Sequence, residues 1–321
     1  MPALDIVIVN WNSGEQLREC LESIAAAATA REIVNRVVVI DNASTDGSAE
    51  RVICRELPLQ VVRNDRNRGF AAACNQGAAA AGADYLLLLN PDARLYRDSL
   101  AGPLAFMSAP ANHDVAICGV QMNDESGSIW RSCSRFPTSR LVIGQALGLD
   151  KVLPRWFPSQ AMLEWDHTTT RAVDEVSGAF FWVRRSAWDR LGGLDETFFM
   201  YYEEVDFCLR AAHLGYRTVF LADTRAFHRG AGTSQSIKAR RLFYSRRSRV
   251  TYAAKHFSRL EAAGVLGATL LAEPWPRLVR AALRQSVRDA TETVHGFAML
   301  WGALPQLVGA VRAGPACGSG R

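Results

Sequence analysis

The chain has 321 residues, of which 49% are hydrophobic and 21% are charged, so it can bury one large core or two modest ones. This balance excludes an intrinsically disordered chain. The seven cysteines form no CxxC pair and no Cys/His metal spacing, which argues against a disulfide framework and a structural zinc site. The start, MPALDIVIVNWN, shows no basic leader followed by an apolar region, and we expect a protein of the reducing cytoplasm.

The formal charge of +5 is small, but the positive residues are unevenly distributed. They gather in the C-terminal third, at Lys238, Arg240, Arg241, Arg246, Arg247, Arg249 and Lys255, and again at Arg277, Arg280, Arg284 and Arg288. This clustering predicts a surface that faces a polyanion. Because no helix-turn-helix, zinc-finger or aromatic RNA-binding motif accompanies it, we expect no nucleic-acid partner.

Short apolar runs alternate with helix-length segments in the first third of the chain. The runs are Leu4–Val9, Val37–Ile40, Val61–Val62 and Tyr85–Leu89, and the predicted helices between them span residues 14–28 and 70–81. The alternation predicts an α/β fold with a mostly parallel sheet covered by helices on both faces. Such sheets bind ligands at the carboxyl ends of their strands, so the loops after these runs form the candidate site.

Periodicity weakens between residues 137 and 171, where we expect irregular structure of the kind that shapes a substrate cleft. Regular elements return with a strand at 176–183, a helix at 203–214 and a strand at 218–222.

Polar residues follow the first two predicted strands. Asn10-Trp11-Asn12-Ser13 ends the first strand, and Asp41 opens the loop 41–47 after the second. Such groups can hydrogen-bond a base and a ribose, and the carboxylate of Asp41 suits a pyrimidine N3–H. Taken alone, each loop is better explained by helix caps and a turn.

Asn90-Pro91-Asp92 follows the run that ends at Leu89, so a turn stiffened by Pro91 places Asp92 just beyond a buried strand. A carboxylate there can hold Mg²⁺ or Mn²⁺, which neutralises a diphosphate leaving group. The alternative is that these residues serve only as a turn.

Three carboxylates, Glu203, Glu204 and Asp206, enter the first turn of the predicted helix at 203–214. Glu203 and Asp206 share one helix face because they are three residues apart. Acids at a helix N-terminus complement the helix dipole and need no function. Here they follow the aromatic run 198–202, where charge is costly unless it is used, and this favours a functional site.

Together these motifs resemble the family 2 glycosyltransferases of the bacterial rhamnosyltransferase-like group. The matching segments are 7–12, 39–48, 67–75, 87–93, 177–181, 192–196, 203–210 and His228, in order and at the family's spacing. The resemblance, which covers residues 4–230, implies a GT-A fold. It also implies a donor pocket lined by Asp41, which reads the base, and by Asn10, Asn12, Ser44, Gly69 and Asn75.

The resemblance further implies a metal site. Asp92 corresponds to the last acid of the family's DxD motif, whose first acid is replaced here by Asn90. The implied Mg²⁺ or Mn²⁺ is held by Asp92, the diphosphate of the donor and His228. For His228, a purely structural role is an equal alternative.

The Glu203-Glu204 pair resembles the family's ED motif, whose second member is the catalytic base. Glutamate stands where many relatives have aspartate, which leaves the base open between Glu204 and Asp206. The base must be ionised to accept a proton, and the helix dipole favours the ionised form. Attack opposite the leaving diphosphate passes through an oxocarbenium-like state and inverts the anomeric carbon.

The implied reaction transfers a sugar from a dTDP or UDP donor, with dTDP-L-rhamnose as the first candidate, to a saccharide or lipid-linked saccharide in cell-envelope polysaccharide synthesis. The alternative is a catalytically silent nucleotide-sugar-binding protein, against which the retained acids Asp92, Glu203, Glu204 and Asp206 argue. A Rossmann dehydrogenase is excluded, because residues 10–14 stand where its GxGxxG motif would follow the first strand.

We predict a catalytic domain over residues 1–235, with the nucleotide-sugar site in 1–120 and the acceptor and catalytic part in 121–235. A basic helical extension follows over 236–321. Its residues Arg277, Arg280, Arg284 and Arg288 should form one helical stripe beside Val279, Leu283 and Val287. Such a helix either lies on an anionic membrane surface, at the inner face of the cell membrane, or packs on the catalytic domain or on a second subunit of a homodimer.

Overall fold

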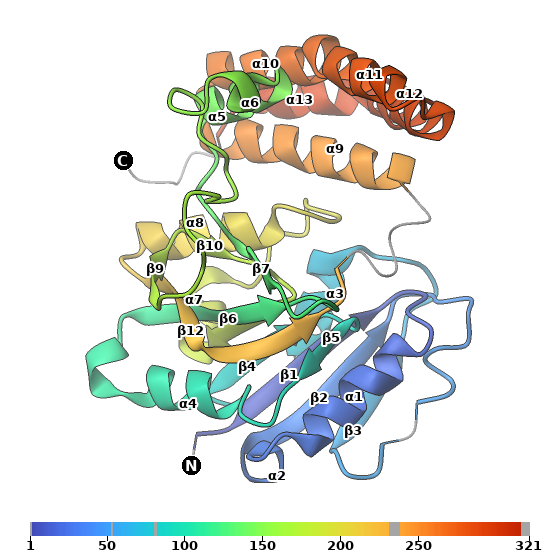
Figure 1. Ribbon diagram of the computed structural model, residues 1–321. Coiled ribbons are helices and arrows are strands. Elements are labelled where there is room, and N and C mark those ends of the chain that lie inside the picture. The colour runs from blue at the N-terminus through green and yellow to red at the C-terminus, as the bar shows by residue number, and fades with distance from the viewer. Residues whose placement is uncertain (1, 53, 80–81, 231–237, 316–321) are drawn as a thin grey trace. The chain divides into compact units, whose positions relative to one another are not determined.

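The computed structural model describes residues 2–52, 54–79, 82–230 and 238–315, and the chain divides into two compact units (Figure 1). The first unit comprises Met1–Arg135, Ala161–Glu196 and Glu203–Thr233. The second comprises Phe136–Gln160, Thr197–Tyr202 and Ser234–Arg321. The second unit thus includes two segments that lie earlier in the chain than the predicted C-terminal extension.

A mixed sheet forms the centre of the first unit, with the order β3-β2-β1-β4-β11-β6-β12-β5 among the described residues. Strands β1 to β4 run parallel, β11 is antiparallel between β4 and β6, and β12 is parallel to β6. The strands of this path are β1 (Leu4–Asn10), β2 (Val34–Asp41), β3 (Leu59–Arg63), β4 (Tyr85–Leu89), β5 (Ala93–Leu95), β6 (Val115–Asn123), β11 (Phe180–Arg184) and β12 (Arg217–His228). Two short strands pair at its side, β7 (Ile129–Trp130) with β6 and β9 (Arg171–Val173) with β12, while β8 (Cys133–Ser134) and β10 (Glu175–Val176) form a separate pair.

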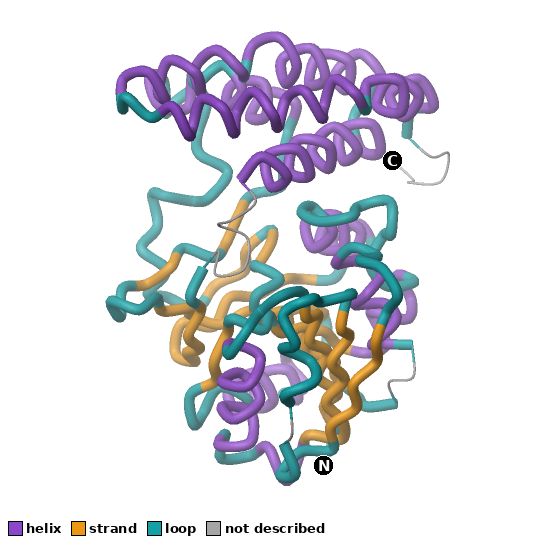
Figure 2. Tube along the Cα trace, turned by 90° about the vertical axis from the view of Figure 1, so that its right-hand side faces the viewer, coloured by secondary structure: helices purple, strands orange, loops and turns teal. Residues whose placement is uncertain are grey.

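Helices cover both faces of this sheet, because successive side chains of a strand point to opposite faces (Figures 1 and 2). Ile6 and Ile8 of β1 join the core cluster that contains Leu17 of α1 (Gln16–Ala26). Val7 faces the other way, toward α3 (Phe70–Ala78), where a Cβ atom on Gly77 would lie 2.5 Å from Val7 Cγ1. Glycine at this position therefore lets the helix approach the sheet closely. The other helices of the unit are α2 (Ala30–Ile33), η1 (Pro110–Asn112), α4 (Ala101–Ser108), α7 (Arg185–Leu191) and α8 (Glu203–His213).

The structure confirms the α/β prediction and its first four strands, but two later predictions were wrong. The single strand expected at 176–183 is broken into β10 and β11, because the chain turns at residues 177–179, where Phe180 N donates to Ser177 O. The segment 137–171 is not wholly irregular, since it contains α5 (Ser139–Ala146) and α6 (Leu149–Val152). Thr138 caps α5 by accepting a hydrogen bond from Leu141 N at 3.3 Å, a signal that was available in the sequence.

The second unit is helical. Its helices are α5 and α6 together with α9 (Lys238–His256), α10 (Arg259–Gly267), the π-helical turn η3 (Ala268–Ala272), α11 (Pro274–Leu283), α12 (Val287–Gly302) and α13 (Leu304–Ala313). Their core gathers Val250 of α9, Val265 of α10, Phe297 of α12 and Leu307 of α13. The aromatic segment Thr197–Tyr202 packs on α9, where Phe199 stacks on Tyr244 with ring centroids 4.5 Å apart.

The prediction of one continuous helix through Arg277–Arg288 was wrong. The chain turns after Leu283, because Gln285 adopts a left-handed φ of 51° and Ser286 begins a new helix by accepting a hydrogen bond from Asp289 N.

Among the described residues, no single helix is long and apolar enough to cross a membrane. Only α12 and α13 taken together have the length and composition of a span, and a 56° bend separates them.

A buried ion cluster joins three elements of the second unit. Glu273, between η3 and α11, contacts Arg246 at 2.6 Å, Arg277 at 2.9 Å and the fully buried Arg249. Burial alone would raise the pKa of Glu273, but the three guanidinium groups outweigh it and hold the pKa at about 2. A carboxyl whose pKa is lowered on folding stabilises the fold above its unfolded pKa, and this stabilisation is lost as the pH falls toward 2.

We expect Glu273→Gln to destabilise the second unit by roughly 3 kcal/mol, because it leaves three arginines around an uncharged side chain. Calorimetric unfolding of the full chain would show a transition shifted to lower temperature. The matched control is Glu32→Gln, which removes an exposed acid of the first unit and should leave the transition unchanged. Equal melting of both variants would contradict the role given to the cluster.

Candidate functional site

The predicted site residues of the first unit meet at one edge of the sheet. Asn10 is level with Asp41 in the β1–β2 register, and Ile8 is level with Leu89 in the β1–β4 register, so the loop that carries Asp92 begins at the same edge. Strand β12 ends at His228, which pairs with Ala93 of β5. The carboxyl ends of the parallel strands therefore bring the polar loops together, as the strand pattern predicts.

Asn10 and Asp41 form a buried polar pair at this edge. Asn10 Nδ2 lies 2.8 Å from Asp41 Oδ1 and 3.1 Å from Ser44 Oγ. Asn12, with a left-handed φ of 52°, receives a hydrogen bond from Thr45 N at 2.7 Å and donates its own N–H to Ser44 Oγ. Four predicted pocket residues are thus connected, and Asp41 retains a second carboxylate oxygen for a donor group of a ligand.

A network of side-chain amides holds the neighbouring loop and was not identified from the sequence. Asn42 Nδ2 donates to Asn67 Oδ1 and to Gly69 O, and Asn42 Oδ1 accepts from Asn64 and from Arg68 N. The network fixes Gly69, whose φ is 88°, beside the residue that follows Asp41. The asparagine-rich run 64–67 was the available signal, since such side chains hydrogen-bond loop backbone.

Asn75 is engaged elsewhere in the unit. Its amide donates to Leu194 O at 2.8 Å and to Glu196 Oε1 at 3.0 Å, and its Oδ1 accepts from Leu194 N at 2.9 Å. These bonds anchor the loop 193–196 to α3. The predicted contact of Asn75 with the donor stays a prediction.

Asp92 and His228 form a buried pair. His228 Nε2 lies 3.2 Å from Asp92 Oδ1, their side chains are 7% and 9% exposed, and Trp130 packs on the imidazole with ring centroids 4.7 Å apart. Two ligands at right angles on a divalent metal, each about 2.1 Å from it, are about 3 Å apart, so this spacing fits a shared ion. No cluster of three His, Cys, Asp or Glu side chains suited to a metal occurs in the described ranges, so Asp92 and His228 form only part of a ligand set.

The three acids of α8 have different surroundings. Asp206 is fully buried and forms a 2.7 Å ion pair with Arg210, which also donates to Leu191 O and Gly193 O. Glu203 is buried, whereas Glu204 is half-buried. The predicted shared face of Glu203 and Asp206 is therefore the inward face of the helix.

Glu204 is linked to the loop of Asp92 by backbone contacts. The Gly178 N–H donates to the Glu204 carboxylate, and a Cβ atom on Gly178 would collide with Glu204 Oε1. The next residue, Ala179, accepts a hydrogen bond from Asn90 N at 3.1 Å. The turn between β10 and β11 thus brings Glu204 to the same sheet edge as Asn90 and Asp92.

Glu175 of β10 is a second buried carboxyl near Glu204 and was missed in the sequence, where nothing distinguishes it from a strand residue. Ser134 hydrogen-bonds to it, and burial together with the charge of Glu204 raises the pKa of Glu175 to about 8. Burial also raises the pKa of Glu204, although its own N–H and that of Gly178 act in the opposite direction. Because the two carboxyl groups share a desolvated environment, a negative charge on Glu204 favours the protonated form of Glu175.

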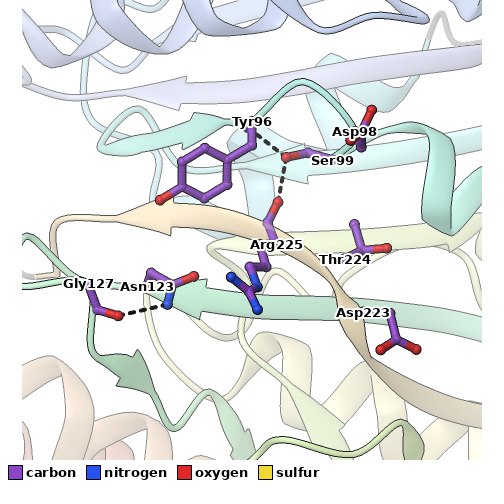
Figure 3. Close-up of a pocket in the computed structure, with 8 residues that line it drawn as sticks. All are labelled: Tyr96, Asp98, Ser99, Asn123, Gly127, Asp223, Thr224 and Arg225. Atoms are coloured by element: carbon purple, nitrogen blue, oxygen red, sulfur yellow. Dashed lines mark hydrogen bonds between the residues drawn. The ribbon is translucent and has the colours of Figure 1, made fainter.

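A separate cavity of about 410 Å³ lies beside β12 and none of the predicted residues lines it (Figure 3). Ser99 Oγ donates to Arg225 O and Asn123 Nδ2 donates to Gly127 O, so these side chains hold the walls together. The cavity is lined by Tyr96, Asp98, Ser99, Asn123, Gly127, Asp223, Thr224 and Arg225.

Comparison with known proteins identifies the chain as a glycosyltransferase, and its α/β architecture is the GT-A fold. The family model for glycosyl transferase family 2 matches residues 5–192, more than half of the chain, and the chain belongs to this family. It is 28% identical to the N-acetylglucosaminyl-diphospho-decaprenol L-rhamnosyltransferase of Mycobacterium tuberculosis, over 91% of this chain and 98% of that protein. It is 25% identical to the rhamnosyltransferase WbbL of Escherichia coli, over 78% of this chain and 92% of that protein.

Solved structures show the same fold. The mannosyltransferase PcManGT of Pyrobaculum calidifontis, in complex with GDP-Man and Mn²⁺, superposes with a TM-score of 0.53 at 20% identity, covering 97% of this chain and 86% of that one. TarS 1-349 of S. aureus, in complex with UDP-GlcNAc, gives a TM-score of 0.52 at 14% identity, covering 94% of this chain and 92% of that one.

We expect the stability of the protein to fall as the pH rises from about 5.5 to 8, by on the order of 3 kcal/mol, because Glu175 ionises freely in the unfolded chain while the folded site keeps it protonated. The sign follows from a pKa raised on folding to about 8: the stabilisation is complete below the unfolded pKa and is lost as the pH approaches 8. Glu175→Gln keeps the shape without the charge and should flatten this dependence in melting curves. A variant that retains the full wild-type slope would contradict the assignment.

Proposed function

We propose that this enzyme transfers L-rhamnose from dTDP-L-rhamnose to a lipid-linked diphosphate saccharide, with inversion at the anomeric carbon, in cell-envelope polysaccharide synthesis. The observation that carries the proposal is the convergence of the Asn10–Asp41 pair, the Asp92–His228 pair and Glu204 on one sheet edge. The two rhamnosyltransferases with matching sequences support the sugar, and the diphospho-decaprenol named for the mycobacterial enzyme supports the acceptor class.

Asp41 and Asn10 are the groups suited to the donor base. Asn10 orients the Asp41 carboxylate by holding Oδ1, and the other oxygen can accept the N3–H of thymine or uracil. Both bases carry this donor, so the pocket selects a pyrimidine without deciding between dTDP and UDP. The amide network around Asn42 keeps the loop of Gly69 in place beside this pocket.

Asp92 and His228 are the residues that would hold a divalent metal. When bound, Mg²⁺ or Mn²⁺ neutralises the charge that develops on the diphosphate leaving group. The Asp92 carboxylate and the imidazole are already oriented by β5–β12 pairing and by Trp130, so little reorganisation is needed on binding. The Mn²⁺ bound to PcManGT, which has the same fold, supports the proposal of a divalent metal.

Glu204 fits the role of base better than Asp206. The Asp206 carboxylate is fully buried and paired with Arg210, which stabilises its ionised form and makes it a weak proton acceptor. Glu204 is half-buried, its pKa is raised, and no ion pair joins it to a cation in the described residues. A carboxylate with a raised pKa takes a proton more readily from an attacking hydroxyl, provided that it is ionised at the working pH.

We expect wild-type enzyme supplied with dTDP-L-rhamnose to release dTDP only when Mg²⁺ or Mn²⁺ is present, and Asp92→Ala to abolish this turnover. Because the variant also removes the partner of the buried His228, its melting temperature is measured beside turnover, so that a lost metal ligand is distinguished from a lost fold. Nucleotide release is measured with and without EDTA, and UDP- and GDP-sugars are compared as donors.

The control for Asp92 is Asp98→Ala, an exposed acid of the same unit. Normal activity of Asp92→Ala, with both proteins indifferent to EDTA, would exclude the metal role. Faster turnover with a GDP-sugar would overturn the assignment of the donor and leave the metal role intact.

We expect Glu204→Gln to keep donor binding and to lower transfer at least ~10²-fold, the usual scale of general-base catalysis. Asp206→Asn should act mainly on stability, since it weakens the anchor that Arg210 provides to the loop 191–193. Donor titration, transfer rate and melting temperature are measured for both variants. Near-normal transfer by Glu204→Gln beside a stable but inactive Asp206→Asn would assign the base to Asp206.

A further inference from the structure

The second unit exposes a continuous row of large apolar side chains along η3 and α11. Leu271, Trp275, Val279 and Leu283 follow one another at intervals of four residues, and Val287 continues the interval at the start of α12. Their exposed fractions are 63%, 68%, 57%, 81% and 81% in that order. Residues four apart lie on one helix face, so the first four form a stripe rather than scattered positions. Soluble monomers rarely leave such a stripe uncovered.

A row of arginines flanks this stripe. Arg280, Arg284 and Arg288 each follow a stripe residue directly, and all three are exposed. None of them forms an ion pair within 4 Å in the described part of the chain, although the charge of Arg280 acts on Asp150 and that of Arg284 acts on Asp289. Arg277, predicted to belong to the same row, points instead to Glu273 in the buried ion cluster. The exposed positive charges therefore border the apolar stripe on one side.

We propose that this face of α11 binds the surface of an anionic lipid bilayer, with Trp275, Val279 and Leu283 entering the headgroup boundary and Arg280, Arg284 and Arg288 contacting lipid phosphates. A helix with an apolar stripe bordered by arginines has the composition of an interfacial helix. Tryptophan is enriched at this boundary, because its ring is apolar and its N–H needs a polar partner. The proposal does not depend on the donor, the metal or the base.

The charge of the arginine row favours a lipid bilayer over a second copy of the chain as the partner that covers the stripe. In a symmetric dimer the same patch lies on both subunits, so two rows of three arginines would be brought to one interface, where the nearby acids Asp150 and Asp289 are too few to balance them. Anionic lipid phosphates complement those rows instead. The apolar stripe and the arginines therefore favour lipid as the occupant.

The test is co-sedimentation of the full chain with phosphatidylcholine vesicles that contain about 30% phosphatidylglycerol, and with phosphatidylcholine alone. We expect binding to the anionic vesicles only, weakened by added salt through screening. The triple variant Arg280→Gln, Arg284→Gln, Arg288→Gln should bind about a hundredfold more weakly, at a contribution near ~1 kcal/mol per arginine.

The matched control is Arg31→Gln, Arg55→Gln, Arg97→Gln, which removes three exposed arginines of the first unit and changes the net charge equally. It should bind as the wild type does. Equal loss of binding in both triple variants would overturn the proposal, because attraction would then depend on net charge alone.

Insertion of the stripe is tested separately. Vesicles with brominated acyl chains should quench tryptophan fluorescence in the wild type, and Trp275→Phe should lose most of this quenching although seven other tryptophans remain. Leu283→Gln should weaken binding without lowering the melting temperature, because Leu283 is exposed. Absence of quenching in the wild type would overturn the proposal. A concentration-dependent dimer that Leu283→Gln dissociates, with no vesicle binding, would assign the face to a second copy.

Discussion

The site depends on the hydrogen-bond and ion-pair partners that offset the cost of burying each carboxylate at the sheet edge. Asp41 receives the amide of Asn10, Asp92 contacts His228, and Asp206 is paired with Arg210. A buried acid without such a partner would neutralise itself or unfold its surroundings. The partners come from strands or helix turns that the parallel register places at one level, so the sheet determines which acids can remain charged.

Glu204 has no such charged or side-chain amide partner in the described residues, and this fits its proposed role as the general base. It is held by backbone N–H groups and lies near a second buried carboxyl, Glu175, rather than a cation. Hydrogen bonds to backbone orient a carboxylate without removing its basicity as fully as an arginine does. Tyr201 and Tyr202, just before α8, have left-handed φ values of 70° and 74°. Such backbone strain in non-glycine residues often accompanies functional sites.

The sequence allowed prediction of the features that depend on local pattern. The buried runs that become β1 to β4, and the loops that carry Asn10, Asp41 and Asp92, could be identified because parallel strands are continuous apolar runs with polar ends. Glu175 could not, because its burial beside Glu204 arises only when β10 pairs with β8. The turn at Gln285 was also missed, since a left-handed residue other than glycine has a weak sequence signal.

In the second unit, too, a buried charge is paired with groups of opposite charge. Glu273, once buried between η3 and α11, draws in Arg246, Arg249 and Arg277, so these arginines belong to the interior despite the basic composition of their helices. Arg280, Arg284 and Arg288 lie beyond the reach of that carboxylate and stay in solvent. From composition alone, the two sets of arginines look like one basic stripe. In the structure, the arginines that contact Glu273 stabilise the helices, whereas the exposed row can contact a partner.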